Sequence, residues 1–559
     1  MSHSLHIYLA QVNPTVGDLE RNTRIIRKVM AEAPSDADLI VFPEMVLTGY
    51  PLEDLVLKPS FLDDVKRHVE DIVQETKHHR TALILTTPWA EKGKVYNAFH
   101  LVHDGYILAT RYKHKLPNYG VFDEARVFHP GDLPDPVEFL GHKLGVMICE
   151  DMWSSDVSSH LAKQGAEMLI VTNGSPYDCR KTQARFDLAA ERVTETGLPL
   201  LYTNLVGGQD ELVFDGGSFI LNESGTKILQ APYFQDDGIM TVWEKSGEHW
   251  LCATEEMTQV PSEDEATYEA CMLGLRDYIH KNGMSDVLIG LSGGIDSALT
   301  AAIAVDALGA EHVHCVMMPS PFTSEESLDA AQALVDKLGV DYQTIPITPA
   351  METFESLIPD LDGIAHENMQ SRTRGLILMS LSNKNGPLVL TTGNKSENAV
   401  GYATLYGDMC GAFSVLKDMF KNQVYDLAEW RNKNTPSGAL GPDNNVIPEI
   451  IITRPPSAEL RADQKDQDSL PPYEVLDEIL RLIVEEDRSF DGVVKEGFDP
   501  KMVEEIWHKV DSTEYKRRQG PPGVKLTTRS FGRERRYPIT NNYRPSHNVL
   551  PLANKAQKQ

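Results

Sequence analysis

The chain has 559 residues and a formal net charge of −29, from 53 Lys and Arg against 82 Asp and Glu. One hydrophobic core does not extend over so many residues, which indicates two or three domains. The acidic balance argues against sequence-independent binding to nucleic acid and against docking on an anionic membrane, because both depend on clusters of basic residues.

Six cysteines are scattered along the chain and none forms a C-x-x-C pair, so the sequence gives no support for a structural zinc site. The first residues show no basic segment followed by a long apolar one, and no apolar run is long enough to span a bilayer. We therefore expect a cytoplasmic protein.

The first 220 residues or so alternate strand and helix signals. Helical spacing marks residues 18–33, where Ile25, Ile26, Val29 and Met30 fall on one face. Short apolar strands are predicted at 5–12, 38–44, 81–88, 143–151 and 167–175. Several of these strands end in a polar residue, which is where α/β proteins place their functional groups.

Residues 246–264 are polar, acidic and non-periodic, and we expect them to form a linker. A helix is predicted at 266–283, followed by further strands at 286–292, 312–320, 341–348 and 387–394. The sequence therefore predicts an α/β protein with one domain at 1–245 and a second at 265–559.

The stretch LIGLSGGIDSALTAA at 288–302 is typical of a strand, a glycine turn and a helix start. Such a turn points backbone N–H groups at one place and favours a bound phosphate. The lysine of the common P-loop is missing. Asp296 is a hard oxygen ligand suited to Mg²⁺ shared with phosphate oxygens, and Ser292 and Ser297 are candidate donors to a pyrophosphate.

Three residue types in the first domain together suffice for amide hydrolysis through a thioester. Cys149 supplies a thiol nucleophile, Glu44 a base for its proton, and Lys113 a cation for the thiolate and for the oxyanion. Taken singly, each also fits a structural role, as a buried cysteine, a helix cap and a solvated lysine.

The segments VFPEMVLTGYPLEDL, RYKHKLPNYGVFDE and GVMICEDMW resemble the three motifs of the nitrilase superfamily, in the same order. They are most similar to the glutaminase domains that are fused to NAD synthetases. The resemblance implies an αββα sandwich with Glu44 as general base, Lys113 at the oxyanion and Cys149 as nucleophile. It also implies that Tyr119, Ser175 and Lys181 contact glutamine.

The sequence SGGIDS resembles the signature of ATP pyrophosphatases, which cleave ATP between its α- and β-phosphates. Four further segments, at 367–383, 390–409, 417–432 and 514–525, are similar to glutamine-dependent NAD synthetases. The resemblance implies a parallel-sheet nucleotide-binding domain like that of adenine nucleotide α-hydrolases. The implied ATP contacts are Gly290, Leu291, Ser292, Gly293, Gly294, Ile295, Asp296, Ser297, Thr392, Lys421 and Ser457.

The same resemblance implies an acceptor site for deamido-NAD⁺ and a metal site. The acceptor contacts would be Asn368, Arg372, Glu397 and Lys516, and the Mg²⁺ ligands Asp296 and Glu397. It further implies that ATP is a co-substrate, that ammonia passes through a tunnel, and that the second domain pairs in a homo-oligomer. The expected activity is amidation of deamido-NAD⁺ with glutamine as the nitrogen donor.

Three other hypotheses remain at this stage. The first domain could be an amidase for another substrate and the second a nucleotide sensor, since fold analogy alone permits it. The chain could be a nucleotide-binding interaction protein, although that hypothesis predicts a changed Glu44, Lys113 or Cys149. It could also be an amidotransferase that acts on a different carboxylate or carbonyl.

Overall fold

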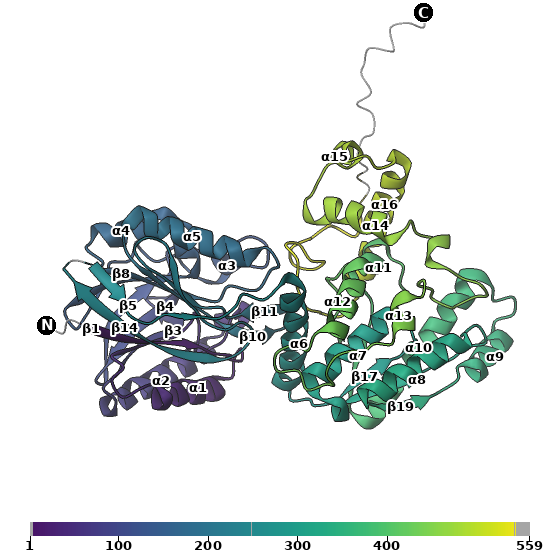
Figure 1. Ribbon diagram of the computed structural model, residues 1–559, viewed down its shortest axis with the longest axis horizontal. Helices are drawn as coiled ribbons and strands as arrows, with labels where there is room; N and C mark the ends of the chain where they lie inside the picture. The colour runs from purple at the N-terminus through teal and green to yellow at the C-terminus, as the bar shows by residue number, and fades with distance from the viewer. Residues whose placement is uncertain (1–3, 248, 542, 544–559) are drawn as a thin grey trace, which may run out of the picture. The chain divides into compact units, whose positions relative to one another are not determined.

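The computed structural model describes residues 4–247, 249–541 and 543, and the chain divides into two compact units, 1–263 and 264–559 (Figure 1). The last residues of the domain predicted at 265–559 lie outside the described ones. Among the described residues, no helix has both the length and the apolar character that crossing a bilayer requires.

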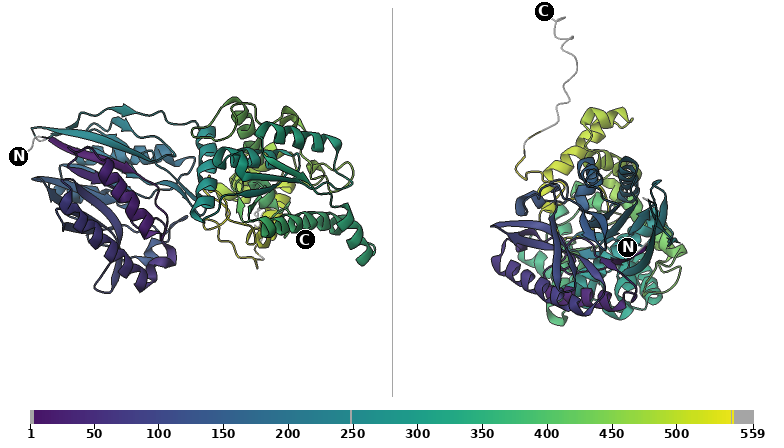
Figure 2. Two further views of the ribbon diagram at one scale, coloured as in Figure 1. Left: turned by 90° about the horizontal axis from the view of Figure 1, so that it is seen from below. Right: turned by 90° about the vertical axis from the view of Figure 1, so that its left-hand side faces the viewer.

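The first unit is built on two seven-stranded sheets that lie face to face (Figures 1 and 2). In spatial order, the first sheet contains β15 (His249–Cys252), β14 (Asp237–Ser246), β1 (Ser4–Gln11), β2 (Leu39–Val41), β3 (Ala82–Glu91), β4 (Lys94–His103) and β5 (Tyr106–Tyr112). The second contains β16 (Glu256–Met257), β13 (Lys227–Gln230), β12 (Phe219–Leu221), β9 (Leu200–Asn204), β8 (Met168–Asn173), β7 (His142–Ile148) and β6 (Val137–Phe139).

Helices cover the outer faces of the two sheets, which gives the predicted αββα sandwich. The helices of this unit are α1 (Leu19–Glu32), α2 (Pro59–Glu75), α3 (Glu124–Val127), α4 (Ser155–Lys163) and α5 (Lys181–Thr196). A separate hairpin pairs β10 (Val206–Gln209) with β11 (Leu212–Asp215).

Side chains of β1 alternate between the two faces of the first sheet, and each face packs against a different layer of the sandwich. Leu5, Ile7 and Leu9 face the core between the two sheets, whereas Ala10 belongs to the core under α1 and α2. The Asp18 side chain caps α1 by accepting a hydrogen bond from the Arg21 amide, a contact that contributes about 1 kcal/mol. Each large apolar side chain fully buried in these layers contributes about 1.5–3 kcal/mol.

The segment expected to be a linker, 246–264, includes strands in the structure. β15 pairs with β14, and β16 pairs with β13, so both sheets of the first unit end in this segment. Trp250 is fully buried against the inter-sheet core. β15 and β16 are short strands at the sheet edges, with four and two residues, so the segment shows no strand periodicity in its sequence.

The second unit has a five-stranded sheet in which all neighbouring strands are parallel, as predicted. Its order is β19 (Asp341–Thr344), β18 (Val313–Met317), β17 (Val287–Gly290), β20 (Leu388–Thr391) and β21 (Phe413–Ser414). The helices that follow these strands or precede them are α6 (Glu263–Lys281), α7 (Ile295–Leu308), α8 (Glu325–Leu338), α9 (Thr348–Leu357), α10 (Gly363–Asn385), α11 (Lys395–Val400) and α12 (Lys421–Lys433).

Residues beyond α12 add a helical cluster with its own core. It contains α14 (Tyr473–Leu480), α15 (Phe490–Lys495), α16 (Pro500–Ser512) and α17 (Glu514–Arg517), whereas α13 (Glu449–Thr453) packs against α7 and α12. Leu476 and Val503 from this cluster pack with Ala399 of α11 in one core. That packing fixes α11, the helix that carries Glu397, against the rest of the unit.

Candidate active sites

Glu44, Lys113 and Cys149 come together in the first unit, each just after a strand ends. Glu44 follows β2, Lys113 follows β5 and Cys149 follows β7. All three are buried, at 0%, 1% and 3% exposed respectively. The Nζ atom of Lys113 lies 2.8 Å from Oε1 of Glu44, so a cation and a carboxylate lie in contact in a water-poor site.

The backbone at Cys149 has a positive φ of 45°, an angle that residues other than glycine rarely adopt. Asp151 holds this turn. Its Oδ2 accepts from the Ile148 amide at 3.2 Å, and its Oδ1 accepts from the amides of His114 and Lys115 at 3.0 and 2.8 Å. One buried carboxylate therefore ties the nucleophile turn to the segment that carries Lys113.

Glu124 completes this cluster and was not singled out in the sequence analysis. Its Oε1 lies 2.8 Å from Nζ of Lys113 and accepts from the Tyr50 hydroxyl at 2.9 Å. Burial raises the pKa of Glu124 to about 7, against the opposing effect of Lys113, and Glu44 raises it further. The one available signal was its place eleven residues after Lys113, inside the same motif.

The electrostatics of the cluster favour a charged lysine and a neutral thiol. Burial tends to lower the pKa of Lys113, but Glu124 and Glu44 raise it well above its usual value. Burial raises the pKa of Cys149 well above its usual value, and the nearby Glu44 raises it further. The resting cysteine is thus a thiol at neutral pH, and its proton has to be removed by a neighbouring base.

The predicted glutamine contacts differ in how they are held. Ser175 is buried, and its hydroxyl accepts from Nε of Arg185 at 3.1 Å. Tyr119 is about half exposed, and its hydroxyl donates to Glu150 at 3.0 Å. Lys181 Nζ lies 5.1 Å from the centre of the Phe122 ring. The structure thus links Tyr119 to Glu150, the residue after the nucleophile.

In the second unit, the glycine turn joins β17 to α7 as predicted from LIGLSGGIDS. The Ser297 hydroxyl donates to the Gly294 carbonyl at 3.0 Å and accepts from the Ser292 amide at 3.2 Å. Gly293 has a φ of +78°, and a Cβ built there would lie 2.4 Å from the Ser327 carbonyl oxygen. Only glycine fits at position 293, because both the backbone angle and the space exclude a side chain.

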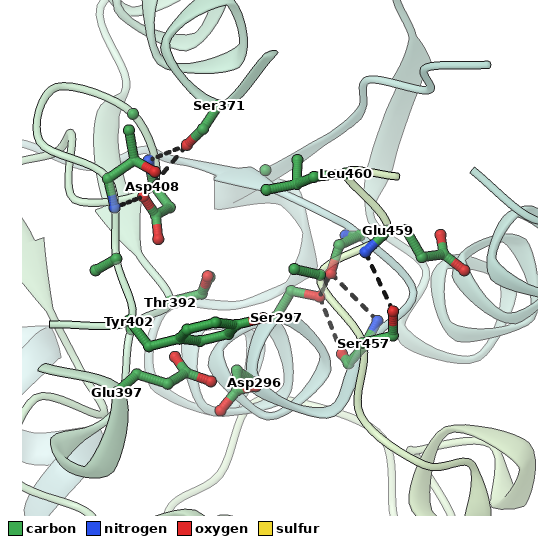
Figure 3. A pocket seen from close by; sticks show the side chains of 18 of the residues that line it. Asp296, Ser297, Ser371, Thr392, Glu397, Tyr402, Asp408, Ser457, Glu459 and Leu460 are labelled. Carbon is green, nitrogen blue, oxygen red and sulfur yellow. Dashed lines mark hydrogen bonds between the residues drawn. The ribbon is translucent and has the colours of Figure 1, made fainter. Parts of the chain in front are cut away.

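This turn forms part of the wall of a cavity of about 550 Å³ (Figure 3). The predicted residues that line it are Gly290, Leu291, Ser292, Gly294, Ile295, Asp296, Ser297, Asn368, Thr392, Glu397, Lys421, Ser457 and Lys516. Its volume is in the usual range for a ligand-binding cavity. Residues separated by more than 200 positions in the sequence therefore share one site.

Two predicted residues are not among those that line the cavity. Gly293 packs behind the turn against Ser327. Arg372 is exposed, and its Nε donates to the Leu405 carbonyl at 3.1 Å. Ser457 lines the cavity, but its hydroxyl donates to the Gln464 carbonyl at 2.6 Å and accepts from the Glu459 amide (Figure 3).

Two acidic residues meet at the cavity floor around a single lysine. Nζ of Lys421 lies 2.5 Å from Asp296 Oδ2 and 3.0 Å from Glu397 Oε1. Asn394 Nδ2 donates to the other oxygen of Asp296 at 2.8 Å. Burial raises the pKa of Glu397 to about 7; Lys421 opposes this and Asp296 adds to it.

This pair of carboxylates is a fit for a divalent cation that is shared with phosphates. Carboxylate oxygens are the hard ligands that Mg²⁺ prefers, and Mg²⁺ at nucleotide sites is usually held by one or two carboxylates plus phosphate oxygens and water. Among the described residues, no group of three or more His, Cys, Asp or Glu could hold a metal ion by itself. The protein part of such a site would therefore be Asp296 and Glu397.

Comparison with known proteins gives matches across both units. The family model described as carbon-nitrogen hydrolase matches residues 7–242, and the one described as NAD synthase matches residues 267–520. A glutamine-dependent NAD(+) synthetase of Rhodobacter capsulatus is 46% identical over 550 residues, which cover 97% of this chain and all of that protein. The chain belongs to the family of glutamine-dependent NAD(+) synthetases.

Solved structures agree with this family. The glutamine-dependent NAD⁺ synthetase of Acinetobacter baumannii, solved with adenosine diphosphate, is 40% identical with a TM-score of 0.76, covering 97% of this chain and all of that one. The enzyme of Cytophaga hutchinsonii, at 22% identity and a TM-score of 0.79, covers 96% of this chain and 97% of its own and shares the fold. The predicted family and fold class are thus confirmed.

Arg454 is a second candidate residue that the sequence analysis did not identify. It lines the cavity of the second unit, and its Nη1 donates to the Ser327 hydroxyl at 2.8 Å. Its Nη2 lies 3.5 Å from the Gly293 carbonyl oxygen. The guanidinium is thus placed beside the glycine turn, where a cation would face a bound phosphate.

Proposed function

We propose that this chain makes NAD⁺ from deamido-NAD⁺ in an ATP-dependent reaction and takes the nitrogen from glutamine. The observation that supports it most is the pair of sites, one in each unit, in a chain that aligns with glutamine-dependent NAD(+) synthetases over 97% of its length. AMP, pyrophosphate and glutamate are the other products, and the enzyme is a ligase.

In the first unit, Cys149 attacks the side-chain amide carbon of glutamine. Glu44 takes the thiol proton and returns it to the departing nitrogen, so ammonia leaves and a thioester remains. The Lys113 ammonium stabilises the oxyanion of the tetrahedral intermediate. Water then hydrolyses the thioester to glutamate. Tyr119, Ser175 and Lys181 are proposed to hold the amino-acid end of glutamine.

In the second unit, the nicotinate carboxylate attacks the α-phosphorus of ATP and pyrophosphate leaves. The turn at Ser292–Ser297 offers N–H and hydroxyl donors to the pyrophosphate oxygens, and Lys421 offers a cation. Ammonia then attacks the acyl adenylate, and AMP leaves. Thr392 and Ser457 are proposed as further ATP contacts, and Asn368, Arg372, Glu397 and Lys516 as contacts of deamido-NAD⁺.

Mg²⁺ is part of the proposal, with Asp296 and Glu397 as the residues that would hold it. When bound, the ion neutralises charge on the phosphate oxygens. Chelation of divalent cations is expected to abolish NAD⁺ formation with either nitrogen donor. Glutamine hydrolysis in the first unit should continue, because that chemistry uses only side chains.

We also propose that the chain forms at least a dimer through its second unit and works in the cytoplasm. Exposed apolar side chains on the α9 and α10 region support the dimer, with Leu357, Ile364 and Leu376 exposed by 69%, 75% and 64%. Light scattering of the wild type and of Leu376→Asp would test it. A monomeric wild type would contradict this part of the proposal.

The test of the function is NAD⁺ formation by the purified full-length protein from deamido-NAD⁺, ATP and Mg²⁺, with either glutamine or ammonium. The wild type should use both donors, and Cys149→Ala should use only ammonium. A wild type that hydrolyses glutamine but forms NAD⁺ from neither donor would favour the amidase with a nucleotide-sensing second unit.

A further inference from the structure

Asn97 is a buried amide that contacts two of the three residues in the glutaminase cluster. It lies in β4, opposite Pro88 of β3, and is fully buried. Its Nδ2 donates to Glu44 Oε1 at 2.7 Å. Its main-chain carbonyl accepts from the Lys113 amide at 2.8 Å. One residue of the sheet therefore sets the position of both the base and the cation.

The hydrogen bonds to Glu44 are unequal on its two oxygens. Oε1 accepts from Asn97 Nδ2 and from Lys113 Nζ, which together occupy both of its lone-pair directions. Oε2 accepts from the Gly174 amide at 2.8 Å, and among the described residues this amide is its one hydrogen-bond donor. Oε2 thus keeps a lone pair that can receive a proton.

We propose that Asn97 is a positioning residue for the general base of the glutaminase site. It holds Oε1 so that Oε2 is the atom that takes the Cys149 proton. In this step the S–H bond breaks and an O–H bond forms at Oε2, the sulfur electron pair bonds to the amide carbon of glutamine, and the π electron pair of the amide C=O moves onto its oxygen. The inference rests on the proposed function, because it needs glutamine hydrolysis in the first unit.

The surroundings explain why an amide serves here. Glu44 already shares its site with the carboxylate of Glu124 and lies near Tyr50, Cys149 and Glu150, all of which are neutral or negative. Lys113 is the cation in contact with it. An amide adds a donor without adding charge, whereas an aspartate at position 97 would place a further carboxylate in this cluster.

Asn97 Oδ1 adds a second argument. It is buried and has no hydrogen-bond partner among the described residues. A buried acceptor without a donor costs free energy. The Nδ2 atom, which contacts Glu44, is therefore the end of the amide that forms a stabilising hydrogen bond. In a purely structural role, both ends of the amide would form hydrogen bonds.

The experiment compares Asn97→Leu with Gln230→Leu in the full-length protein. Gln230 is also a fully buried amide of the first unit, and its Nε2 donates to the main-chain carbonyls of Gly217, Ser218 and Ala231. Each preparation is assayed for glutamine hydrolysis from pH 5 to 9 and for NAD⁺ formation with ammonium. Thermal unfolding fixes a temperature at which all variants are folded.

We expect Asn97→Leu to lower kcat for glutamine about 100-fold, the usual contribution of a positioned base, with KM changed less than about 3-fold. The acidic limb of its pH profile should move to higher pH, because the ionised carboxylate has lost a donor. Asn97→Asp should move this limb further in the same direction. Ammonium-supported synthesis and the activity of Gln230→Leu should stay within about 2-fold of wild type.

Three results would overturn the inference. An unchanged kcat in Asn97→Leu would show that Glu44 needs no positioning by this amide. A raised KM with normal kcat would place Asn97 in glutamine binding. A pH profile that keeps its acidic limb in both variants would leave a structural role only. Failure of the wild type to form NAD⁺ from ammonium would instead contradict the proposed function, while the glutaminase comparison would still be valid.

Discussion

Lys421 Nζ lies 2.5 Å from Asp296 Oδ2, although the two residues are 125 positions apart in the sequence. Asp296 lies in the first turn of α7 and Lys421 opens α12. The same Nζ reaches Glu397 at 3.0 Å. Burial lowers the pKa of Lys421, but these two carboxylates outweigh that effect and raise the pKa above its usual value. The lysine therefore stays charged.

Lys421→Met should therefore leave two partly buried carboxylates, each with 18% of its side chain exposed, without their cation. Breaking a buried pair in this way costs about 3–5 kcal/mol, and NAD⁺ formation should be lost with both nitrogen donors. Urea-induced unfolding and the two-donor assay measure these effects. Lys433→Met is the control on the same helix, since Lys433 pairs with Glu429 at the surface and such pairs contribute about 0.3–0.5 kcal/mol. Equal losses in both variants would contradict the prediction.

Lys113→Met should abolish glutamine hydrolysis and leave ammonium-supported synthesis intact. The variant removes the cation that Glu44 and Glu124 share, so the first unit should also be less stable by several kcal/mol. Lys115→Met is the matched control two residues away, because Lys115 Nζ pairs with Asp156 in a partly exposed site. Glutamine turnover by Lys115→Met within about 2-fold of wild type is expected; a loss there comparable to that of Lys113→Met would refute the assignment.

The pH dependence of Cys149 alkylation follows from its raised pKa. Burial, and then Glu44, disfavour the thiolate, so the reaction with iodoacetamide should rise only at pH values above the pKa of an ordinary cysteine. Glu44→Gln removes a neighbouring negative charge and should shift this rise to lower pH. The same variant should lose glutamine hydrolysis, because its amide accepts no thiol proton. Mass spectrometry of Cys149 follows the reaction, and an unshifted profile would count against the coupling.

Arg454→Met should raise the KM for ATP about 10-fold, because it removes a cation beside the phosphate-binding turn. Arg461→Met is the control from the neighbouring loop, since Arg461 pairs with Glu367 and Asp468 in an exposed position. Initial rates with ammonium as donor separate this effect from the glutaminase. No change in KM for ATP with Arg454→Met would exclude a phosphate contact.

Much of both sites could be predicted because their residues lie where strands end. Glu44 and Cys149 end apolar runs that any α/β fold would bury, and the turn from Ser292 to Ser297 has a local pattern of its own. Glu124 and Arg454 were missed because a single charge at the end of a helix of four or five residues carries no period or spacing. Asn97 was missed because no strand was predicted over 94–103, where β4 lies in the structure, and a single polar residue carries no signal of burial by itself.

The linker expected at 246–264 shows a related limit of sequence patterns. Short edge strands such as β16 contain too few residues to show alternation, so they cannot be told from loop. Arg372 illustrates a different limit. A matching motif identifies the position of a residue in the chain, but it does not determine which way the side chain points. In the structure that side chain reaches the Leu405 carbonyl.

The fit of Gly293 against Ser327 has a consequence for the energetics of ligand capture. The φ of +78° and the contact with the Ser327 backbone leave this turn little freedom before any ligand arrives. Its conformational entropy is lost during folding, so a phosphate meets donors that are already arranged and binding incurs little ordering cost. A bulkier residue at position 293 would reopen the turn, and affinity would then fall even though no atom that touches the ligand had changed.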